Sequence, residues 1–285
     1  MCYFYKECQI NKQLMKIIFT LLAAVFLTAT SFAQVGINNE TPDASAALDI
    51  TSTTGGLLVP RMTASQRNLI TSPTQGLIIF CTDCASGEGE LQVRLASSWK
   101  NTSGGEVNDP PPAVGDFYQG GVVFYLFESG DMGYVEGEIH GLIAAAEDQY
   151  RGNNDSRSIS WKNGSYVTTG ATATAIGTGS SNTDIIISVQ GATETYAAGL
   201  ARAYNGGGFT DWFLPSKDEL NKMYQKKEDI NAIAAVVGDN LSDVSYWSSS
   251  ETSNQEAWYQ HFSNGYRNNV SKGFTFMYVR AVRAF

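Results

Sequence analysis

Residues 101–115, NTSGGEVNDPPPAVG, constrain the fold of this chain more than any other stretch of it. Three successive prolines (110–112) lack backbone N–H donors and favour an extended backbone, and the Gly, Ser and Asn residues around them offer little apolar surface for packing. We interpret the stretch as a linker. It separates residues 34–100 from residues 116–285, two segments with lengths typical of independent or nearly independent folding units.

Residues 1–33 have the pattern of a bacterial export signal. Lys16 precedes an apolar run, and SFA (31–33) is a small-x-small cleavage site. We therefore predict a mature chain that begins at Gln34, with residues 1–14 as an over-extended start. The apolar run is too short for stable membrane insertion, and no cysteine follows the cleavage site to carry a lipid anchor. The chain is predicted to be secreted or held at the cell surface.

Charge excludes one class of partner. The whole chain has a formal net charge of −9, and the predicted leader carries three lysines but only one glutamate, so the exported chain is more acidic still. Nucleic acid demands clustered Lys and Arg, and no stretch of the sequence has such a cluster. We predict no nucleic-acid partner.

Export leaves two cysteines, Cys81 and Cys84, in the sequence FCTDC. In an oxidising compartment this spacing predicts a short structural disulfide that closes a loop. A redox-active pair is the alternative, but such pairs normally open a helix, whereas GLIIF before Cys81 predicts a strand. Zinc would need two further ligands, for which the only histidines are His140 and His261. We predict no metal and no cofactor.

Residues 34–100 contain short apolar pieces separated by Thr, Ser, Gly and Pro, a pattern that predicts short strands with turns. The expected strands are 47–50, 56–59, 77–80 and 91–95. Because so small a segment has few large apolar residues, we expect it to associate with copies of itself or with the larger domain.

The run VGINNETPDASAALDITSTTGGLLVPRMTASQRNLITSPTQGLIIFCTD resembles the N-terminal module of exported bacterial surface proteins and is similar to phage tail-fibre modules. The resemblance implies a β-rich oligomerisation module over residues 34–100, and fibre-type modules of similar sequence trimerise. We therefore expect a homotrimer.

Residues 116–285 predict a mixed domain. The expected strands are 117–127, 140–146, 244–248, 257–262 and 274–285. One helix is expected over 193–204, and a second begins at Ser216, whose S-x-x-E pattern with Glu219 predicts a capping box. The Gly-, Thr-, Ser- and Asn-rich tract 153–191 is expected to be mostly surface loop.

The stretch YWSSSE (residues 246–251) raises the question of a serine nucleophile. Such a serine needs a nearby base, and neither a G-x-S-x-G elbow nor an S-x-x-K pattern surrounds these serines. The structural interpretation places Trp247 in the core and the serines in a strand that enters a turn, with Glu251 accepting their amides. A carboxylate-dependent glycan hydrolase that uses Asp211, Glu219 or Glu251 is kept as an alternative.

In order and separation, the blocks WFLPSKDEL, YWSSSE, AWYQHFSNG and VRAVRAF resemble the C-terminal domain of the bacterial collagen-like adhesin. That resemblance implies an α+β fold of the C-type-lectin-like class over residues 116–285. It also implies scaffold roles for one set of residues: Trp212, Trp247 and Trp258 in the core, Ser216 and Glu219 at a helix start, and Arg280 and Arg283 paired with buried acceptors or with acids such as Glu219 or Glu251.

The chain departs from related folds in two respects. It has none of the E-P-N, Q-P-D or W-N-D motifs of calcium-dependent sugar-binding lectins, so calcium-mediated recognition is unsupported. Residues 116–285 contain no cysteine, which excludes the activity of the formylglycine-generating enzymes, whose fold is also lectin-like.

The preferred functional prediction is an exported, non-enzymatic binding module that recognises a glycan or a host or matrix protein through polar loops. The candidate ligand-binding residues are Asn182, Asp184, Asp243, Glu251, Asn254, Tyr266, Asn268 and Asn269. An architectural protein of a fibre or surface layer is a further alternative.

Overall fold

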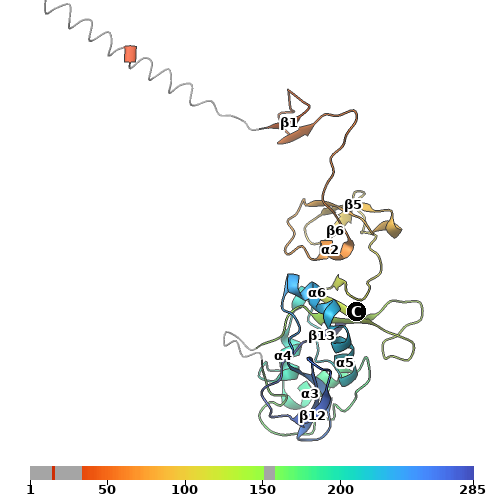
Figure 1. Cartoon of the computed structure of the whole chain (residues 1–285), viewed down its shortest axis with the longest axis vertical. Helices are drawn as coiled ribbons and strands as arrows, with labels where there is room; N and C mark the ends of the chain where they lie inside the picture. The colour runs from red at the N-terminus through yellow and green to blue at the C-terminus, as the bar shows by residue number, and fades with distance from the viewer. Residues whose placement is uncertain (1–14, 17–33, 151–157) are drawn as a thin grey trace, which may run out of the picture. The chain divides into compact units, whose positions relative to one another are not determined.

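The structure, a computed structural model, describes residues 15–16, 34–150 and 158–285 (Figure 1). Its backbone contacts divide the chain into two compact units, Met1–Leu58 and Val59–Phe285, each of which is considered by itself below.

The structure tests only part of what was predicted for the N-terminal region. The export signal and its cleavage site lie outside the described residues, apart from Met15 and Lys16. The division into units falls inside the predicted module 34–100, and the predicted linker 101–115 belongs wholly to the second unit, so the domain boundaries stay predictions. No helix within the described ranges is long and apolar enough to cross a membrane.

The first unit holds one pair of parallel strands, β1 (Val35–Ile37) and β2 (Leu48–Ile50). The Asp49 carboxylate braces the connection between them by accepting the Asn39 side-chain amide at 2.8 Å and the Asp43 backbone N–H at 2.9 Å. Val35 and Leu48 are each about half exposed. The strand pair therefore does not bury its own apolar side chains.

The second unit begins with a small four-stranded sheet in the order β3-β4-β5-β6. Its elements are β3 (Arg61–Met62), α2 (Ala64–Asn68), β4 (Ile78–Cys81), the 3-10 turn η1 (Ala85–Gly87), β5 (Glu90–Arg94) and β6 (Trp99–Asn101). Strands were predicted close to β4 and β5. The predicted strand 56–59 is not formed, and β3 and β6 were not anticipated because each is short and is defined only by its neighbour.

One face of this sheet packs on a compact core that contains Ile79, Trp99 and the bonded pair Cys81–Cys84, whose sulfurs form a disulfide. The buried guanidinium of Arg67 donates to both carboxylate oxygens of Asp109 at 2.8 and 2.7 Å. Asp109 lies in the predicted linker, so the start of that stretch is tied to the sheet.

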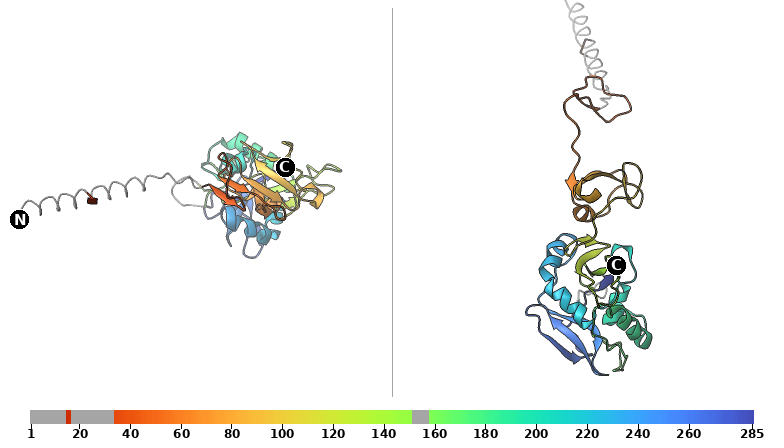
Figure 2. Two further views of the ribbon diagram at one scale, coloured as in Figure 1. Left: turned by 90° about the horizontal axis from the view of Figure 1, so that it is seen from above. Right: turned by 90° about the vertical axis from the view of Figure 1, so that its right-hand side faces the viewer.

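The described residues of the remainder of the second unit, called the head here, form two sheets and four α-helices, arranged as Figures 1 and 2 show. The four-stranded antiparallel sheet runs β13-β9-β8-β7, from β7 (Phe117–Tyr118), β8 (Gly121–Leu126), β9 (Gly141–Ala145) and β13 (Val282–Ala284). The predicted strand 117–127 is thus split, because the chain turns at Gly120, whose φ of 86° and close approach to the backbone of Gly207 admit no side chain.

The helices are α3 (Gly179–Gln190), α4 (Ala197–Ala203), α5 (Lys217–Gln225) and α6 (Lys227–Val237), with the 3-10 turn η3 (Gly206–Gly208) after α4. Helix α3 corrects the prediction of a surface loop over 153–191. Its polar composition hid it, because its buried face includes Asn182 and Thr183, whose side chains bond to protein groups. The second predicted helix is two helices, interrupted at Lys226.

The three-stranded sheet runs β10-β11-β12, from β10 (Ser245–Glu251), β11 (Glu256–His261) and β12 (Arg267–Ser271). Figure 2 shows it in blue as a separate layer of the head. Strand β12 lies where a turn had been predicted. Of the predicted strand 274–285, only the last part forms a strand, which is β13. Helices and antiparallel sheets together confirm the α+β class.

Candidate functional site

The YWSSSE stretch is a fully buried strand. Ser248, Ser249 and Ser250 lie inside β10 and have no exposed surface, so the predicted strand is present but continues through the serines, where a turn was expected to begin. The Ser248 hydroxyl donates to the carbonyl of Trp258 at 3.0 Å, and the Ser249 N–H donates to the carbonyl of Pro215 at 2.7 Å. The serines therefore join β10 to its neighbours and are not presented to a substrate.

Ser250 makes the strongest of these links. Its hydroxyl donates to the carbonyl of Ala173 at 2.6 Å and accepts the N–H of Lys217 at 3.1 Å. The Ser250 side chain thereby connects the loop before α3 to the start of α5 by hydrogen bonds.

We expect Ser250→Ala to lower the free energy of unfolding by about 1–3 kcal/mol, because it removes two part-buried hydrogen bonds and leaves the Lys217 N–H without its partner, while the Ala173 carbonyl keeps only the side-chain amide of Asn182. Ser249→Ala is the matched control: its hydroxyl accepts only a 3.3 Å bond from Asn182, and we expect a loss of about 1 kcal/mol or less. Urea unfolding of the mature chain measures both. Equal losses in the two variants would contradict the assigned role of Ser250.

Glu251 is buried and does not accept the serine amides. Its carboxylate accepts the N–H groups of Thr169 at 3.0 Å and Gly170 at 2.6 Å, and the ammonium of Lys272 lies 2.5 Å away. Burial acts to raise the pKa of Glu251, but the Lys272 ammonium and the two amides hold that pKa below its usual value. Lys272 was not singled out from the sequence, where nothing marks a lone lysine 21 residues from its partner.

Glu219 forms the predicted capping box and does more. Its carboxylate accepts the N–H of Ser216 at 2.7 Å, and it also accepts the N–H of Gly177 at 2.8 Å, just before α3. Burial raises the pKa of Glu219 to about 7 against the lowering effect of these amides. The Glu219 carboxyl group thus accepts backbone N–H groups at the start of α5 and just before α3.

Arg280 pairs with a buried acid, as the prediction of buried acceptors allowed, but the two acids named as examples need correction. Arg280 is buried and pairs with Asp148 at 2.8 Å, and Arg283 pairs with Asp211 and the side chain of Gln119. Neither arginine is bound to Glu219 or Glu251.

The predicted core aromatics divide into two groups. Trp212 and Trp247 are completely buried. Trp258 is only partly buried, contrary to prediction, and the ammonium of Lys217 lies 4.0 Å from its ring centre. Trp258 is thus an accessible aromatic surface on β11.

Two of the predicted ligand-binding residues are internal. Asn182 is 1% exposed and donates to the Ala173 carbonyl at 2.7 Å, and Glu251 is held as described above. Asp184 and Asp243 are exposed but paired, with Arg202 and Lys227 respectively.

The other four are Asn268 and Asn269 on the edge strand β12, Tyr266 in the turn before that strand, and Asn254 in the turn between β10 and β11. They do not form one site. Asn269 stands opposite Trp258 and shares its face of the sheet, whereas Asn268 stands opposite Tyr259 on the other face. Of the two faces of this sheet, the candidate binding face is therefore the one that carries Trp258 and Asn269. On it the Asn269 side-chain amide also donates to Glu256 at 3.0 Å.

Two parts of the chain match known family models. Residues 151–283 match the Lcl C-terminal domain family. This confirms the resemblance seen in the sequence, and the match includes the elements of the head from α3 to β12 and the first two residues of β13. Residues 36–113 match the family described as phage tail like trimerisation region. Together the Lcl C-terminal domain and this second match indicate an adhesin-like surface protein. No curated protein matches the chain.

Proposed function

We propose that the protein is an exported, non-enzymatic adhesin whose Lcl C-terminal domain is a binding head of the C-type-lectin-like class. The observation that carries the proposal is the burial of its most enzyme-like stretch. The serines of YWSSSE and the side chain of Glu251 are buried inside the head. The serines bond to backbone groups, and Glu251 bonds to backbone amides and to Lys272.

The hydrolase alternative is not favoured by the same geometry. Glu219 is completely buried at the start of α5, and Glu251 is 3% exposed, so neither acid can reach a glycosidic bond. Asp211 is exposed, but its carboxylate pairs with Arg283. Glycoside hydrolysis by carboxylates requires two accessible acids that flank the bond to be cleaved.

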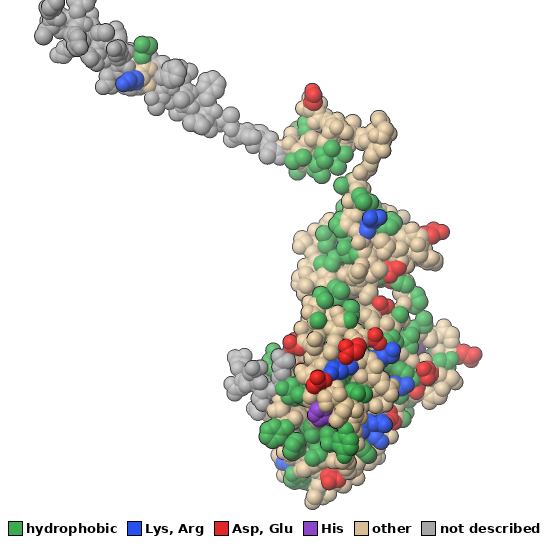
Figure 3. Space-filling model, viewed as in Figure 1, with side chains coloured by type: hydrophobic (Ala, Val, Ile, Leu, Met, Phe, Trp, Pro, Cys, Tyr) green, Lys and Arg blue, Asp and Glu red, His purple; other side chains and the backbone are tan. Residues whose placement is uncertain are grey.

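The face of β11 and β12 around Trp258 is the proposed recognition surface for a glycan or a matrix protein. The partly buried indole offers an apolar surface, and Asn269 beside it, whose amide nitrogen donates to Glu256 and Thr252, offers its side-chain carbonyl as an acceptor. On the side of the molecule drawn in Figure 3, acidic and basic side chains are intermixed and form no single basic patch. Recognition through stacking and neutral hydrogen bonds fits such a surface better than recognition by charge alone.

An array of glycans and matrix proteins, probed with the mature chain, tests this function. We expect a ligand that binds without turnover and binds more weakly to Trp258→Ala. Turnover of an arrayed glycan would instead support the hydrolase, and filament assembly without any ligand would support the architectural alternative.

We further propose that residues 35–100 assemble the protein as a homotrimer. The outer face of the β4–β5 ladder supports this, because the side chains of Ile78, Phe80, Leu91 and Val93 share it. Ile78 is 45% and Leu91 38% exposed. An open apolar sheet face of this kind is stabilised by association, and three linked heads would gain avidity.

We expect Ile78→Glu to abolish assembly, because it places a charge in the proposed interface, while the head stays folded. Light scattering on the mature chain gives the oligomeric state, and near-ultraviolet circular dichroism gives the fold of the head. Val236→Glu, at a 67% exposed position of α6, is the matched control and should leave the trimer intact. A wild-type chain that is monomeric at micromolar concentration would refute the trimer.

A further inference from the structure

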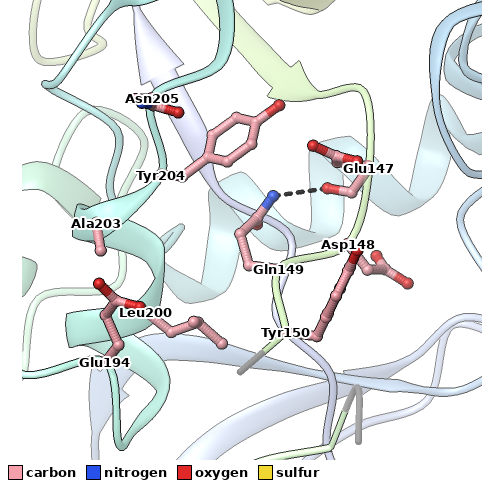
Figure 4. Close-up of a pocket in the computed structure, with 9 residues that line it drawn as sticks. All are labelled: Glu147, Asp148, Gln149, Tyr150, Glu194, Leu200, Ala203, Tyr204 and Asn205. Carbon is pink, nitrogen blue, oxygen red and sulfur yellow. Dashed lines mark hydrogen bonds between the residues drawn. The ribbon is translucent and has the colours of Figure 1, made fainter. Parts of the chain in front are cut away.

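Two adjoining pockets lie along helix α4. The first, of about 210 Å³, is enclosed by the chain that follows β9 (residues 147–150) and by the end of α4 (Figure 4). The second, of about 280 Å³, lies toward α3 and includes Ile187 and Arg202. Both are lined by Glu194 and Ala203, so they form one continuous groove, called the α4 groove here.

The first pocket is negatively charged. Glu147 and Glu194 line it from two different segments, and Figure 4 shows them on opposite sides. Asp148 also lines it, but its charge is balanced by Arg280 at 2.8 Å. The described residues that line this pocket include no Lys, Arg or His, although the charge of Arg280, which pairs with Asp148, also acts on Tyr204. Two carboxylates therefore act on whatever enters it.

The rest of the wall combines the amides of Gln149 and Asn205 with an aromatic and apolar part. The ring of Tyr204 packs edge-on against buried Trp212, with centroids 5.0 Å apart, which fixes its orientation. Burial raises the pKa of Tyr204 to about 12, with a further contribution from the charge of Glu147, so the phenol stays neutral. Leu200 adds an aliphatic surface. An alkyl stem that ends in a cation matches both kinds of wall.

We propose that the α4 groove binds a basic side chain, the ammonium of Lys or the guanidinium of Arg, presented by an extracellular protein. Glu147 and Glu194 pair with the charge, and Tyr204 contacts the cation and its stem. This inference rests on the proposed function of the head as a binding module and names the class of its partner.

Size and polarity support a peptide over a larger ligand. The first pocket is smaller than the roughly 300–1,000 Å³ of pockets that hold drug-sized ligands, and it suits one side chain. The second pocket continues the groove along apolar Ile187 and Ala192, where a neighbouring residue of an extended chain can lie. Its one cation, Arg202, is bound to Asp184 at 2.5 Å and leaves the charge of the first pocket in place.

Fluorescence anisotropy with a labelled Gly-Gly-Arg-Gly-Gly peptide tests the proposal on the mature chain. The Lys peptide should also bind, and the citrulline peptide, an uncharged isostere, should bind about tenfold more weakly. We expect Glu147→Gln and Glu194→Gln each to weaken binding of the Arg peptide about three- to tenfold, and added salt to weaken it further. Glu228→Gln, at an exposed acid on α6, makes the same change in net charge and is the matched control.

Three results would overturn the assignment. One is binding of the Arg peptide that neither groove variant weakens, and another is an equal loss in Glu228→Gln, which would mean attraction to overall charge. The third is displacement of the Arg peptide by free glucosamine with groove-dependent affinity above that of the peptide, which would assign the groove to amino sugars. If arrays reveal a ligand that both groove variants bind normally, this inference fails while the binding-module function stands.

Discussion

Trp247→Ala is expected to lower the free energy of unfolding of the head by about 3–5 kcal/mol, the cost of truncating a fully buried aromatic side chain. Trp247 has no exposed surface and packs in the larger core cluster of the head. Its indole N–H donates to the carbonyl of Ile159 at 2.8 Å, so the substitution also leaves this buried carbonyl without that donor. Urea unfolding followed by far-ultraviolet circular dichroism measures the loss.

Trp258→Ala is the natural control for this experiment, since it deletes the same side chain from the next strand. Trp258 is only partly buried and contacts the ammonium of Lys217. We expect a loss less than half as large as that for Trp247. A midpoint unchanged in Trp247→Ala would mean that Trp247 is exposed, and the assignment of β10 to the core would be wrong.

Lys272→Met is expected to cost about 3–5 kcal/mol, because removing one partner of a buried ion pair leaves the other charge uncompensated. The side chains of Lys272 and Glu251 are 0% and 1% exposed. The ammonium also donates to the carbonyl of Val167 at 2.9 Å and lies 4.4 Å from the ring centre of Trp161. The pair thus ties β10 and the end of β12 to the loop before α3.

The pH dependence of this loss follows from the pKa of Glu251, which is lowered in the folded wild type. A lowered acid pKa contributes stability above the unfolded value of about 4.3, and that contribution is lost as the pH falls through the folded pKa. Without Lys272 the pKa of Glu251 rises, so the stability lost in Lys272→Met should be larger at pH 7 than near pH 4. Unfolding curves at the two pH values give the comparison.

Two further variants isolate the interaction. Lys162→Met removes a partly exposed lysine beside Trp161 and should stay within about 0.5 kcal/mol of wild type. Lys272→Met combined with Glu251→Gln should recover about 0.5–3 kcal/mol relative to the sum of the single losses, as coupled partners do. Additive losses would contradict the ion pair.

The sequence by itself determined the features that depend on near neighbours. Ser216 and Glu219 are three residues apart, so one turn of helix brings them together in any context, and their capping box was predictable. The two cysteines of FCTDC are equally close along the chain. Runs rich in aromatic and β-branched residues predicted strands within a few residues of β8, β10 and β11, and such residues pack well in buried strands.

Only the tertiary structure decided which distant groups meet. Arg280 and Asp148 are 132 residues apart, and Glu251 meets the amide of Thr169 over 82 residues, separations at which no local pattern names the partner. The same reason accounts for α3, a polar segment made internal because Ala173 and Leu214 supply bonds to Asn182 and Thr183. Candidate binding residues were chosen as polar, but burial and strand alternation, which are properties of the fold, separated Asn182 and Glu251 from the surface and Asn268 from Asn269.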